Sequence, residues 1–301
     1  MRILITGSRG QLGNELRRLI STGQAEAGAV PAAYAGASVD YIDIDDLDIS
    51  RWEAVDAWFG AHGPYDLAIN CAAMTNVDGC ETNWQGAFAA NALGPMNLAR
   101  ACAAQGARLV HVSTDYVFPG TDPEPRVEAD VPAPISAYGR TKLAGEGLAL
   151  ANNPRTFVVR TAWLYGYVGK NFVKTMLRLA KTHDHVTVVS DQLGNPTSAN
   201  DLAWQILRLA QTEDFGIYHC TNEGTCSWAD LAEEAFRVAG VPCEVRRCTS
   251  EQWKQINPAS ADRPHFSSLE NTRLKETIGN TMRPWQEALR DYLSNRTPEE
   301  A

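Results

Sequence analysis

A tyrosine and a lysine four residues apart have the spacing that suggests proton-transfer chemistry in this 301-residue sequence. Tyr138 and Lys142 open a segment of helical character, and residues four apart on a helix share one face. A phenol has a pKa of about 10, and a neighbouring ammonium lowers it by stabilising the phenolate. Tyr138 could then exchange a proton with a carbonyl or carbinol oxygen. Thr114, after an apolar run, could donate a second hydrogen bond to that oxygen.

Three glycines near the start predict where a hydride donor would bind. The apolar run Ile3–Ile5 predicts a buried strand, and Gly7, Gly10 and Gly13 follow it at the start of a helix. Glycines let a pyrophosphate approach the backbone, and a helix N-terminus supplies free N–H groups. The spacing is G-x-x-G-x-x-G, so an ordinary strand-to-helix turn is the alternative. A dinucleotide site is favoured because the glycines directly follow a strand and because reduction of the carbonyl that Tyr138 would protonate needs a hydride donor.

A carboxylate near the end of the second predicted strand bears on the cofactor. Asp43 lies in Val39–Ile44, about thirty residues beyond the glycines, where a carboxylate of a βαβ unit binds the adenosine ribose. Such a carboxylate repels a 2′-phosphate and so favours NADH over NADPH. A solvated charge in an acid-rich turn explains Asp43 equally well, and the sequence leaves both interpretations open.

Alternating strand and helix patterns predict an α/β fold. The expected architecture is a Rossmann-type doubly wound parallel sheet with a smaller C-terminal α/β substrate domain. Later strands are predicted at Asp66–Asn70, Arg108–Val112 and Thr156–Thr161. Helices are predicted at Ile49–Ala61, Glu81–Gln105, from Tyr138 through Leu150, and at Asn200–Gln211 with Asn200 as its N-cap. Ligands of such sheets bind at the carboxyl ends of the strands.

Two domains are expected. Residues 1–165 form the predicted NAD(P)-binding domain, and residues 186–215 return to it. Residues 166–185 and 216–301 form the predicted substrate-binding domain.

Composition narrows the classes of partner and location. The formal net charge is -9 and no long basic run occurs, which argues against nucleic acid. No apolar run approaches the length that spans a membrane, and no signal peptide is expected. The seven cysteines, odd in number and without a C-x-x-C pair, predict reduced thiols. We therefore expect a cytoplasmic protein.

Longer motifs resemble the dTDP-4-dehydrorhamnose reductase family, part of the extended short-chain dehydrogenases/reductases. The resemblance runs from Met1 to about Leu293 and rests on residues 10–16, 70–78, 113–118, 138–146, 160–166, 191–197 and 263–264. It implies that NADH or NADPH reduces the C4 keto group of dTDP-4-dehydro-6-deoxy-L-mannose (the L-lyxo-4-hexulose). The product would be dTDP-L-rhamnose, so the implied partner is a dTDP-linked 4-keto-6-deoxy sugar.

The resemblance also implies roles for individual residues. Tyr138 would protonate the new alkoxide, Thr114 would polarise the carbonyl, and Lys142 would lower the pKa of Tyr138 and hold the nicotinamide ribose. The implied cofactor-binding residues are Gly7, Gly10, Gln11, Leu12, Gly13, Asp43, Asp48, Ile49, Ala73, Met74, Thr75, Val112, Tyr138 and Lys142. The implied substrate-binding residues are Thr114, Asp115, Tyr138, Trp163 and Arg263. For Arg263 a structural ion pair is the alternative to a contact with the nucleotide phosphates.

A metal and a second subunit are left open. The resemblance implies that some family members share a Mg²⁺ between two chains of a homodimer, and Glu15 stands where one ligand would be. A carboxylate in the first turn of a helix is also favourable without a metal, and this explanation is preferred. No metal site is therefore predicted.

Four other functions remain as alternatives. A dehydratase of this fold carries Asp and Glu after the strand-end threonine, and Tyr116 stands where that Glu would be. A 4-epimerase or another nucleotide-sugar 4-ketoreductase would use the same fold. A non-catalytic, reductase-like regulatory subunit ranks lower, because Thr114, Tyr138 and Lys142 are all present.

Overall fold

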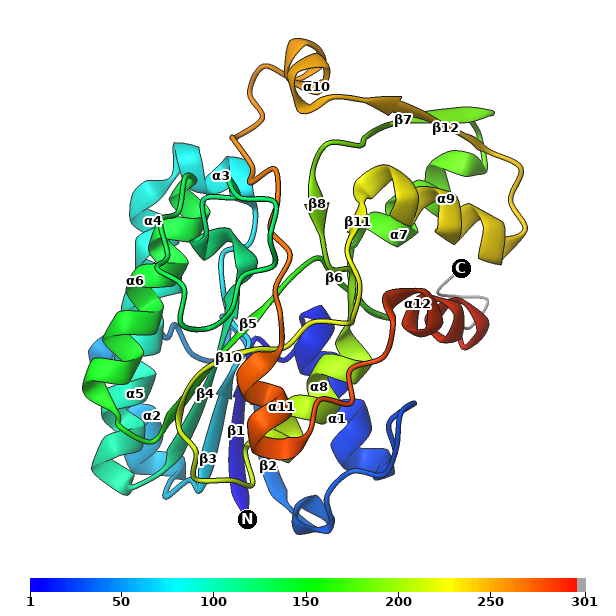
Figure 1. The fold of residues 1–301 in the computed structure, drawn as a ribbon. Coiled ribbons are helices and arrows are strands. Elements are labelled where there is room, and N and C mark those ends of the chain that lie inside the picture. Colours follow the sequence, from blue (N-terminus) through cyan, green and yellow to red (C-terminus); the bar gives the residue numbers. More distant parts are fainter. Residues whose placement is uncertain (297–301) are drawn as a thin grey trace.

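A six-stranded sheet organises the molecule, and the computed structural model describes residues 1–296 of the chain (Figure 1). The strands in spatial order are β2 (Ser38–Ile42), β1 (Arg2–Thr6), β3 (Leu67–Asn70), β4 (Arg108–Thr114), β5 (Thr156–Thr161) and β10 (Gly216–His219). All neighbouring pairs are parallel, which confirms the predicted fold class. The apolar runs of the central strands follow from burial on both faces.

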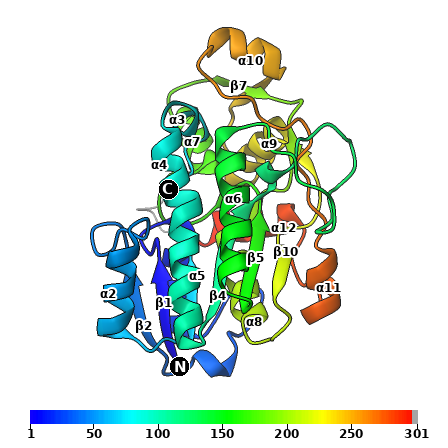
Figure 2. The same ribbon diagram turned by 90° about the vertical axis from the view of Figure 1, so that its left-hand side faces the viewer.

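Helices cover both faces of this sheet (Figures 1 and 2). One face carries α1 (Gln11–Thr22), α8 (Ala199–Leu209) and α11 (Thr272–Ile278), and the other carries α2 (Trp52–His62), α5 (Gly94–Gln105) and α6 (Ala137–Asn152). Successive strand residues point to opposite faces, so Ile3 and Ile5 enter one apolar core and Leu4 enters the other. The two cores hold the helices at fixed positions over the strand ends.

A second group of elements lies at the upper right of Figure 1. It contains β7 (His185–Val189), β12 (Glu244–Cys248), α7 (Phe172–Ala180), α9 (Trp228–Ala239), α10 (Ser250–Ile256) and α12 (Trp285–Ser294). Short pairs join it to the rest of the chain, namely β6 (Leu164–Tyr165) with β9 (Thr197–Ser198) and β8 (Leu193–Gly194) with β11 (Cys226–Ser227). Its apolar core is separate from those of the sheet and includes Val173, Val186 and Leu289.

One boundary of the expected domains needs correction. β10 lies at the edge of the main sheet beside β5, whereas the sequence placed residues 216–219 in the second domain. The sequence of a four-residue strand does not indicate which sheet the strand joins. The division into two domains otherwise stays a prediction, and residues 297–301 of the second domain lie outside the described residues.

The single helix expected over residues 81–105 is interrupted. The structure has α3 (Val77–Thr82), α4 (Trp84–Phe88), a π-helical turn (Ala89–Leu93) and then α5. The turn contains Asn91, whose side-chain amide forms two hydrogen bonds with the backbone of Met74. The Met74 N–H donates to Asn91 Oδ1 at 2.8 Å, and Asn91 Nδ2 donates to the Met74 carbonyl at 3.0 Å. The irregular turn therefore fixes the segment that follows β3.

The start of α8 also differs from the expectation. Ser198, and not Asn200, is the N-cap, because the Ser198 hydroxyl accepts from the Asn200 N–H at 3.2 Å. The Asn200 side chain instead donates to Glu15 at 2.5 Å and accepts from the Glu26 N–H at 2.9 Å. It thereby ties α1 and the loop after it to α8.

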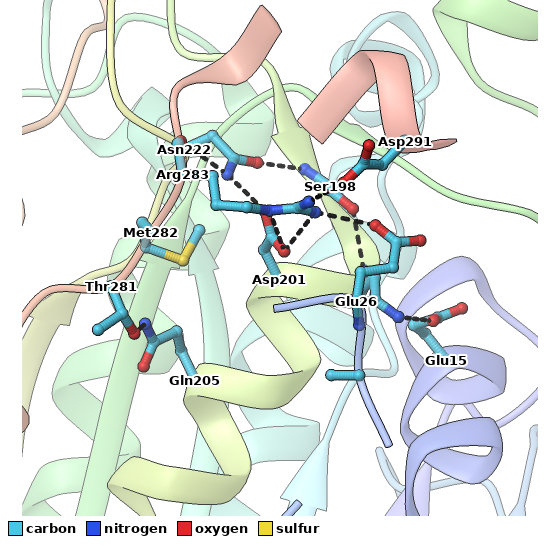
Figure 3. Close-up of polar contacts among 12 residues, drawn as sticks. Glu15, Glu26, Ser198, Asp201, Gln205, Asn222, Thr281, Met282, Arg283 and Asp291 are labelled. Carbon is cyan, nitrogen blue, oxygen red and sulfur yellow. Dashed lines mark hydrogen bonds and ion pairs between the residues drawn. The ribbon is translucent and has the colours of Figure 1, made fainter. Parts of the chain in front are cut away.

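A buried arginine joins the same region to the C-terminal helix (Figure 3). The Arg283 guanidinium is 11% exposed and binds Asp201 of α8 and Glu26, each at 2.8 Å. It also pairs with Asp291 of α12. One cation thus holds carboxylates from both groups of elements together.

Within residues 1–296, none of the helices combines the length and the apolar character that crossing a bilayer requires.

Candidate active site

Two cavities meet at the carboxyl ends of the central strands. One, of about 520 Å³, is lined among others by the predicted residues Asp43, Asp48, Ile49, Ala73 and Met74. The other, of about 500 Å³, is lined among others by the predicted residues Gln11, Leu12, Gly13, Thr75, Val112, Thr114, Asp115, Tyr138, Lys142 and Trp163. Gly7, Gly10, Cys71 and Ala73 belong to both linings. The structure therefore gathers nearly all predicted site residues along one bipartite cleft.

The glycine turn lies where the two cavities adjoin. Gly7 has a positive φ of 66°, and a Cβ there would lie 2.6 Å from the Ala72 nitrogen. A Cβ on Gly13 would lie 2.6 Å from Ser8 Cα, so this glycine serves close packing of α1 on the turn. Gly10 is the N-cap of α1 and has more room. A pyrophosphate at this helix N-terminus would leave one half of a dinucleotide in each cavity, so the residues present fit such a cofactor.

The predicted proton donor lies deep in the second cavity. Tyr138 and Lys142 come from the first turns of α6, which Ser136 caps by accepting from the Gly139 N–H. The Thr114 hydroxyl at the end of β4 forms a hydrogen bond with the Tyr138 phenol, which favours the phenolate. Burial nevertheless outweighs this contact and raises the pKa of Tyr138.

Lys142 is not among the groups that shift the pKa of Tyr138 in this arrangement, and its expected effect on that pKa stays a prediction. The Lys142 ammonium donates to the Val112 carbonyl at 2.6 Å. Burial lowers the pKa of Lys142 to about 8, while Glu146 raises it in part. The groups that lower the pKa of Tyr138 are thus led by Thr114, a neutral donor, rather than by the ammonium.

A buried ion pair beneath the site was not found from the sequence. Arg160 of β5 binds Glu146 of α6 through two hydrogen bonds of 3.0 and 2.7 Å, and both side chains are 2% exposed. The Ser113 hydroxyl donates to the same carboxylate at 2.5 Å. Glu146 continues the four-residue spacing of Tyr138 and Lys142, which is the signal that could have identified it.

Asp43 is held rigidly beside the first cavity. Its Oδ2 accepts from the Arg9 N–H at 3.0 Å, and its Oδ1 accepts from the Ile44 N–H at 2.9 Å. The Arg9 guanidinium binds the exposed Asp45 at 2.6 Å. Because backbone donors orient Asp43 at the cavity wall, the structure favours a positioned carboxylate over a freely solvated one.

Trp163 forms one wall of the second cavity. Its ring stacks on Trp228 with centroids 3.6 Å apart and 7° between the planes. A Cβ on Gly194 would lie 2.6 Å from Trp163 Cε2, so a glycine at this position leaves room for the indole. Trp163 has a positive φ of 47°, a conformation that non-glycine residues seldom adopt. The stack on Trp228 holds the ring in place.

Arg263 lies apart from the bipartite cleft. Its guanidinium binds Asp78 at 3.0 Å and Ser260 at 2.6 Å, and it forms a hydrogen bond with Tyr116. It lines a different cavity, of about 690 Å³, together with Gln192 and other residues. The structural ion pair considered from the sequence is therefore present, and a contact with phosphates stays a prediction.

Glu15 is engaged by protein groups. Its carboxylate binds Arg18 and Asn200, each at 2.5 Å, and the residue is 3% exposed (Figure 3). Within residues 1–296, no three side chains of His, Cys, Asp or Glu gather closely enough to hold a metal ion. The Mg²⁺ that the resemblance implied would be shared between two chains, and the part of Glu15 in such a site stays a prediction.

The chain is similar to known proteins over nearly its whole length. The family model described as RmlD substrate binding domain matches residues 1–297. The dTDP-4-dehydrorhamnose reductase of Mycolicibacterium smegmatis is 41% identical over 97% of this chain and 85% of its own. A crystal structure of a dTDP-4-dehydrorhamnose reductase from Clostridium acetobutylicum is 45% identical, with a TM-score of 0.90 over 98% of this chain and 99% of that chain. The Bacillus anthracis reductase in complex with NADP is 37% identical, with a TM-score of 0.88 over 97% and 98%.

Proposed function

Because the chain belongs to the RmlD substrate binding domain family, we propose that it is an NAD(P)H-dependent reductase of a dTDP-linked 4-keto-6-deoxy sugar. The substrate is dTDP-4-dehydro-6-deoxy-L-mannose, and the product is dTDP-L-rhamnose. The observation that supports this most is the arrangement of the cleft. Thr114, Tyr138 and Lys142 line one half, and the glycine turn leads from there to Asp43 in the other half.

The cofactor, when bound, supplies the hydride that reduces the keto carbon. Tyr138 then gives its proton to the sugar oxygen, which is the general-acid step. Thr114 donates a hydrogen bond to the pair of oxygens between which this proton moves, and it stabilises the negative charge that develops on them. Lys142 contributes a positive charge at the floor of the cavity, where its bond to Val112 holds it in place. Thr114 and Lys142 are buried and Tyr138 is partly buried, which limits access of water and strengthens these interactions.

The sugar and nucleotide contacts are part of the same proposal. The indole of Trp163 offers a rigid apolar face, supported by Trp228, against which a deoxyhexose ring can pack. Arg263 offers a guanidinium beside the neighbouring cavity for the two phosphates. The seven free thiols and the net charge of -9 support a cytoplasmic enzyme. Light scattering would decide whether the protein is the homodimer that the resemblance implies.

The function is tested by following oxidation of NADH or NADPH with the keto-sugar, generated in situ by an upstream dehydratase and epimerase. We expect oxidation that depends on the sugar and yields dTDP-L-rhamnose, identified by chromatography and mass spectrometry. Omission of the epimerase is the control, because it withholds the L-configured ketone. Cofactor binding without turnover of any ketone would contradict the proposal and favour a regulatory subunit.

Replacing Asp43 with alanine should change the preference between cofactors. We expect the Kd of NADH to rise about tenfold, since a hydrogen bond to a charged group contributes about 1.5 kcal/mol or more. The Kd of NADPH should change by less than about threefold, because the lost carboxylate also repelled its 2′-phosphate. Titration of protein fluorescence with each cofactor measures both constants.

The matched control is Asp45→Ala, which removes an exposed carboxylate of the same turn that does not line the cavity. It should leave the Kd of NADH within about twofold of the wild type. Equal losses for NADH and NADPH in Asp43→Ala would show that Asp43 only shapes the turn.

A further inference from the structure

The proposed reaction gives no role to one buried carboxyl group beside Thr114, that of Asp115. Asp115 is 2% exposed and lines the cavity that contains Tyr138. Its Oδ1 accepts a hydrogen bond of 2.9 Å from the Thr114 hydroxyl. Its Oδ2 is buried and, among the described residues, has no hydrogen-bond partner at close range, although the Ser267 hydroxyl interacts with the carboxyl group. A carboxylate in this position would leave a charged oxygen poorly satisfied, which is costly, whereas a neutral acid would not.

The Thr114 hydroxyl has one proton and two neighbours that compete for it. Its oxygen lies between the Asp115 carboxyl group and the Tyr138 phenol, and it already accepts from the Tyr116 N–H at 3.2 Å. When Asp115 is ionised, it can only accept, so the Thr114 proton points toward the carboxylate. When Asp115 is neutral, its O–H can donate to Thr114, whose two lone pairs are then both used. The Thr114 proton is then free to point toward Tyr138.

We propose that Asp115 is a positioning residue that, as a neutral acid, donates to the Thr114 hydroxyl and directs its proton toward Tyr138. This inference rests on the proposed ketoreduction, in which Tyr138 loses a proton in every turnover. A Thr114 proton aimed at Tyr138 stabilises the phenolate that is left behind. A Thr114 proton aimed at Asp115 gives that phenolate no support.

The electrostatic surroundings favour the neutral acid at and below neutral pH. Burial raises the pKa of Asp115 to about 7, although the hydroxyls of Ser267 and Thr114 lower it in part. The titratable groups that face it are the phenols of Tyr116 and Tyr138, and the charge of Asp115 raises the pKa of both. Arg263 acts in the opposite direction on Tyr116.

The sign of the pH dependence follows directly. Below a pH of about 7 Asp115 is neutral and the chain of hydrogen bonds runs toward Tyr138, so kcat is high. As the pH rises through this value, the carboxylate forms, Thr114 turns, and kcat falls. We expect a fall of about tenfold or more, which is less than the roughly 10²–10³ that removing a donor costs, because Thr114 is turned and not removed. Deprotonation of Lys142, whose pKa is lowered to about 8, gives a separate step at higher pH.

Measurement of kcat against pH for the wild type, Asp115→Asn and Ser267→Ala tests the inference. Asparagine can donate to Thr114 but cannot ionise, so Asp115→Asn should lose the lower step and keep the upper one. Below the lower step its loss of kcat should be smaller than that of Thr114→Val, because the asparagine amide still donates to Thr114. Ser267→Ala keeps the acid but removes a group that stabilises its carboxylate, so its lower step should move to higher pH.

A second readout does not depend on turnover. Protein labelled with ¹³C at the aspartate carboxyl carbons, titrated by NMR with NADP present, should show one carboxyl group that titrates near neutral pH. This signal should be missing in Asp115→Asn and should titrate at higher pH in Ser267→Ala.

The outcomes separate the two proposals. Absence of wild-type turnover overturns the proposed function. Wild-type turnover combined with an unchanged lower step in Asp115→Asn overturns the inference alone. A loss of kcat in Asp115→Asn below the step that equals the loss in Thr114→Val also overturns it, because a neutral donor would then not suffice. An Asp115 carboxyl signal that titrates in the ordinary acidic range of an aspartate would overturn the inference as well.

Discussion

Replacement of Tyr138 with phenylalanine is expected to lower kcat by about a thousandfold, because a positioned general acid contributes about 10²–10⁴ in rate. The protein should fold normally, since the ring keeps its edge-to-face contact with Tyr116, whose centroid is 5.8 Å away. KM for the keto-sugar and the Kd of the cofactor should stay within about threefold of the wild type, because the lost proton acts mainly in the transition state. Single-turnover oxidation of NADPH measures the chemical step directly.

The neighbouring phenol provides the control for this variant. Tyr116→Phe removes a hydroxyl from a neighbouring buried ring that contacts Tyr138 and Arg263. It should reduce kcat by less than about tenfold, since this phenol has no place in the proton transfer. Near-wild-type turnover by Tyr138→Phe would mean that another group protonates the sugar oxygen.

Replacement of Arg160 with methionine should have the largest effect on stability. It would leave the Glu146 carboxylate, which is 2% exposed, without its hydrogen-bonded cation, and breaking a buried ion pair in this way costs about 3–5 kcal/mol. Ser113 would remain as a single hydrogen-bond donor to that charge. Urea unfolding followed by circular dichroism measures the loss in the free energy of unfolding.

A double variant shows whether the uncompensated charge is the cause. Adding Glu146→Gln to Arg160→Met removes the buried charge, so the double variant should be more stable than Arg160→Met alone. Arg155→Met is the control, because the Arg155–Glu213 pair is exposed and should contribute less than about 1 kcal/mol. A double variant less stable than Arg160→Met would point to lost packing as the cause.

The sequence predicts the central strands and the glycine turn because their signals are local. The run Ile3–Ile5 is apolar since both faces of a parallel sheet are covered, and a glycine at position 7 reflects a positive φ. The spacing of Tyr138 and Lys142 places both on one helix face, and the structure puts them in one cavity with Thr114. These features depend on neighbours within a few residues along the chain.

The features that the sequence could not predict depend on distant partners. Arg160 and Glu146 are fourteen residues apart, and nothing in either position shows that their side chains meet. The lowered pKa of Lys142 follows from its burial. The helix around Asn91 is irregular, and the Asn91 side chain there binds the backbone of Met74. Asn200 resembles an N-cap locally, but the carboxylate of Glu15 provides a different partner. Burial and tertiary contacts decided each of these cases.

In the π-helical turn at Ala89–Leu93, the number of residues matters as much as their identity. Such a turn holds one residue more than a regular helical turn. Deleting that residue would restore a regular helix, but it would rotate Asn91 by about 100° relative to α5. Asn91 would then lose Met74 and Thr141 together, although every side chain of the site was still encoded. Natural insertions and deletions should therefore collect in loops such as residues 24–37 and be rare in this turn.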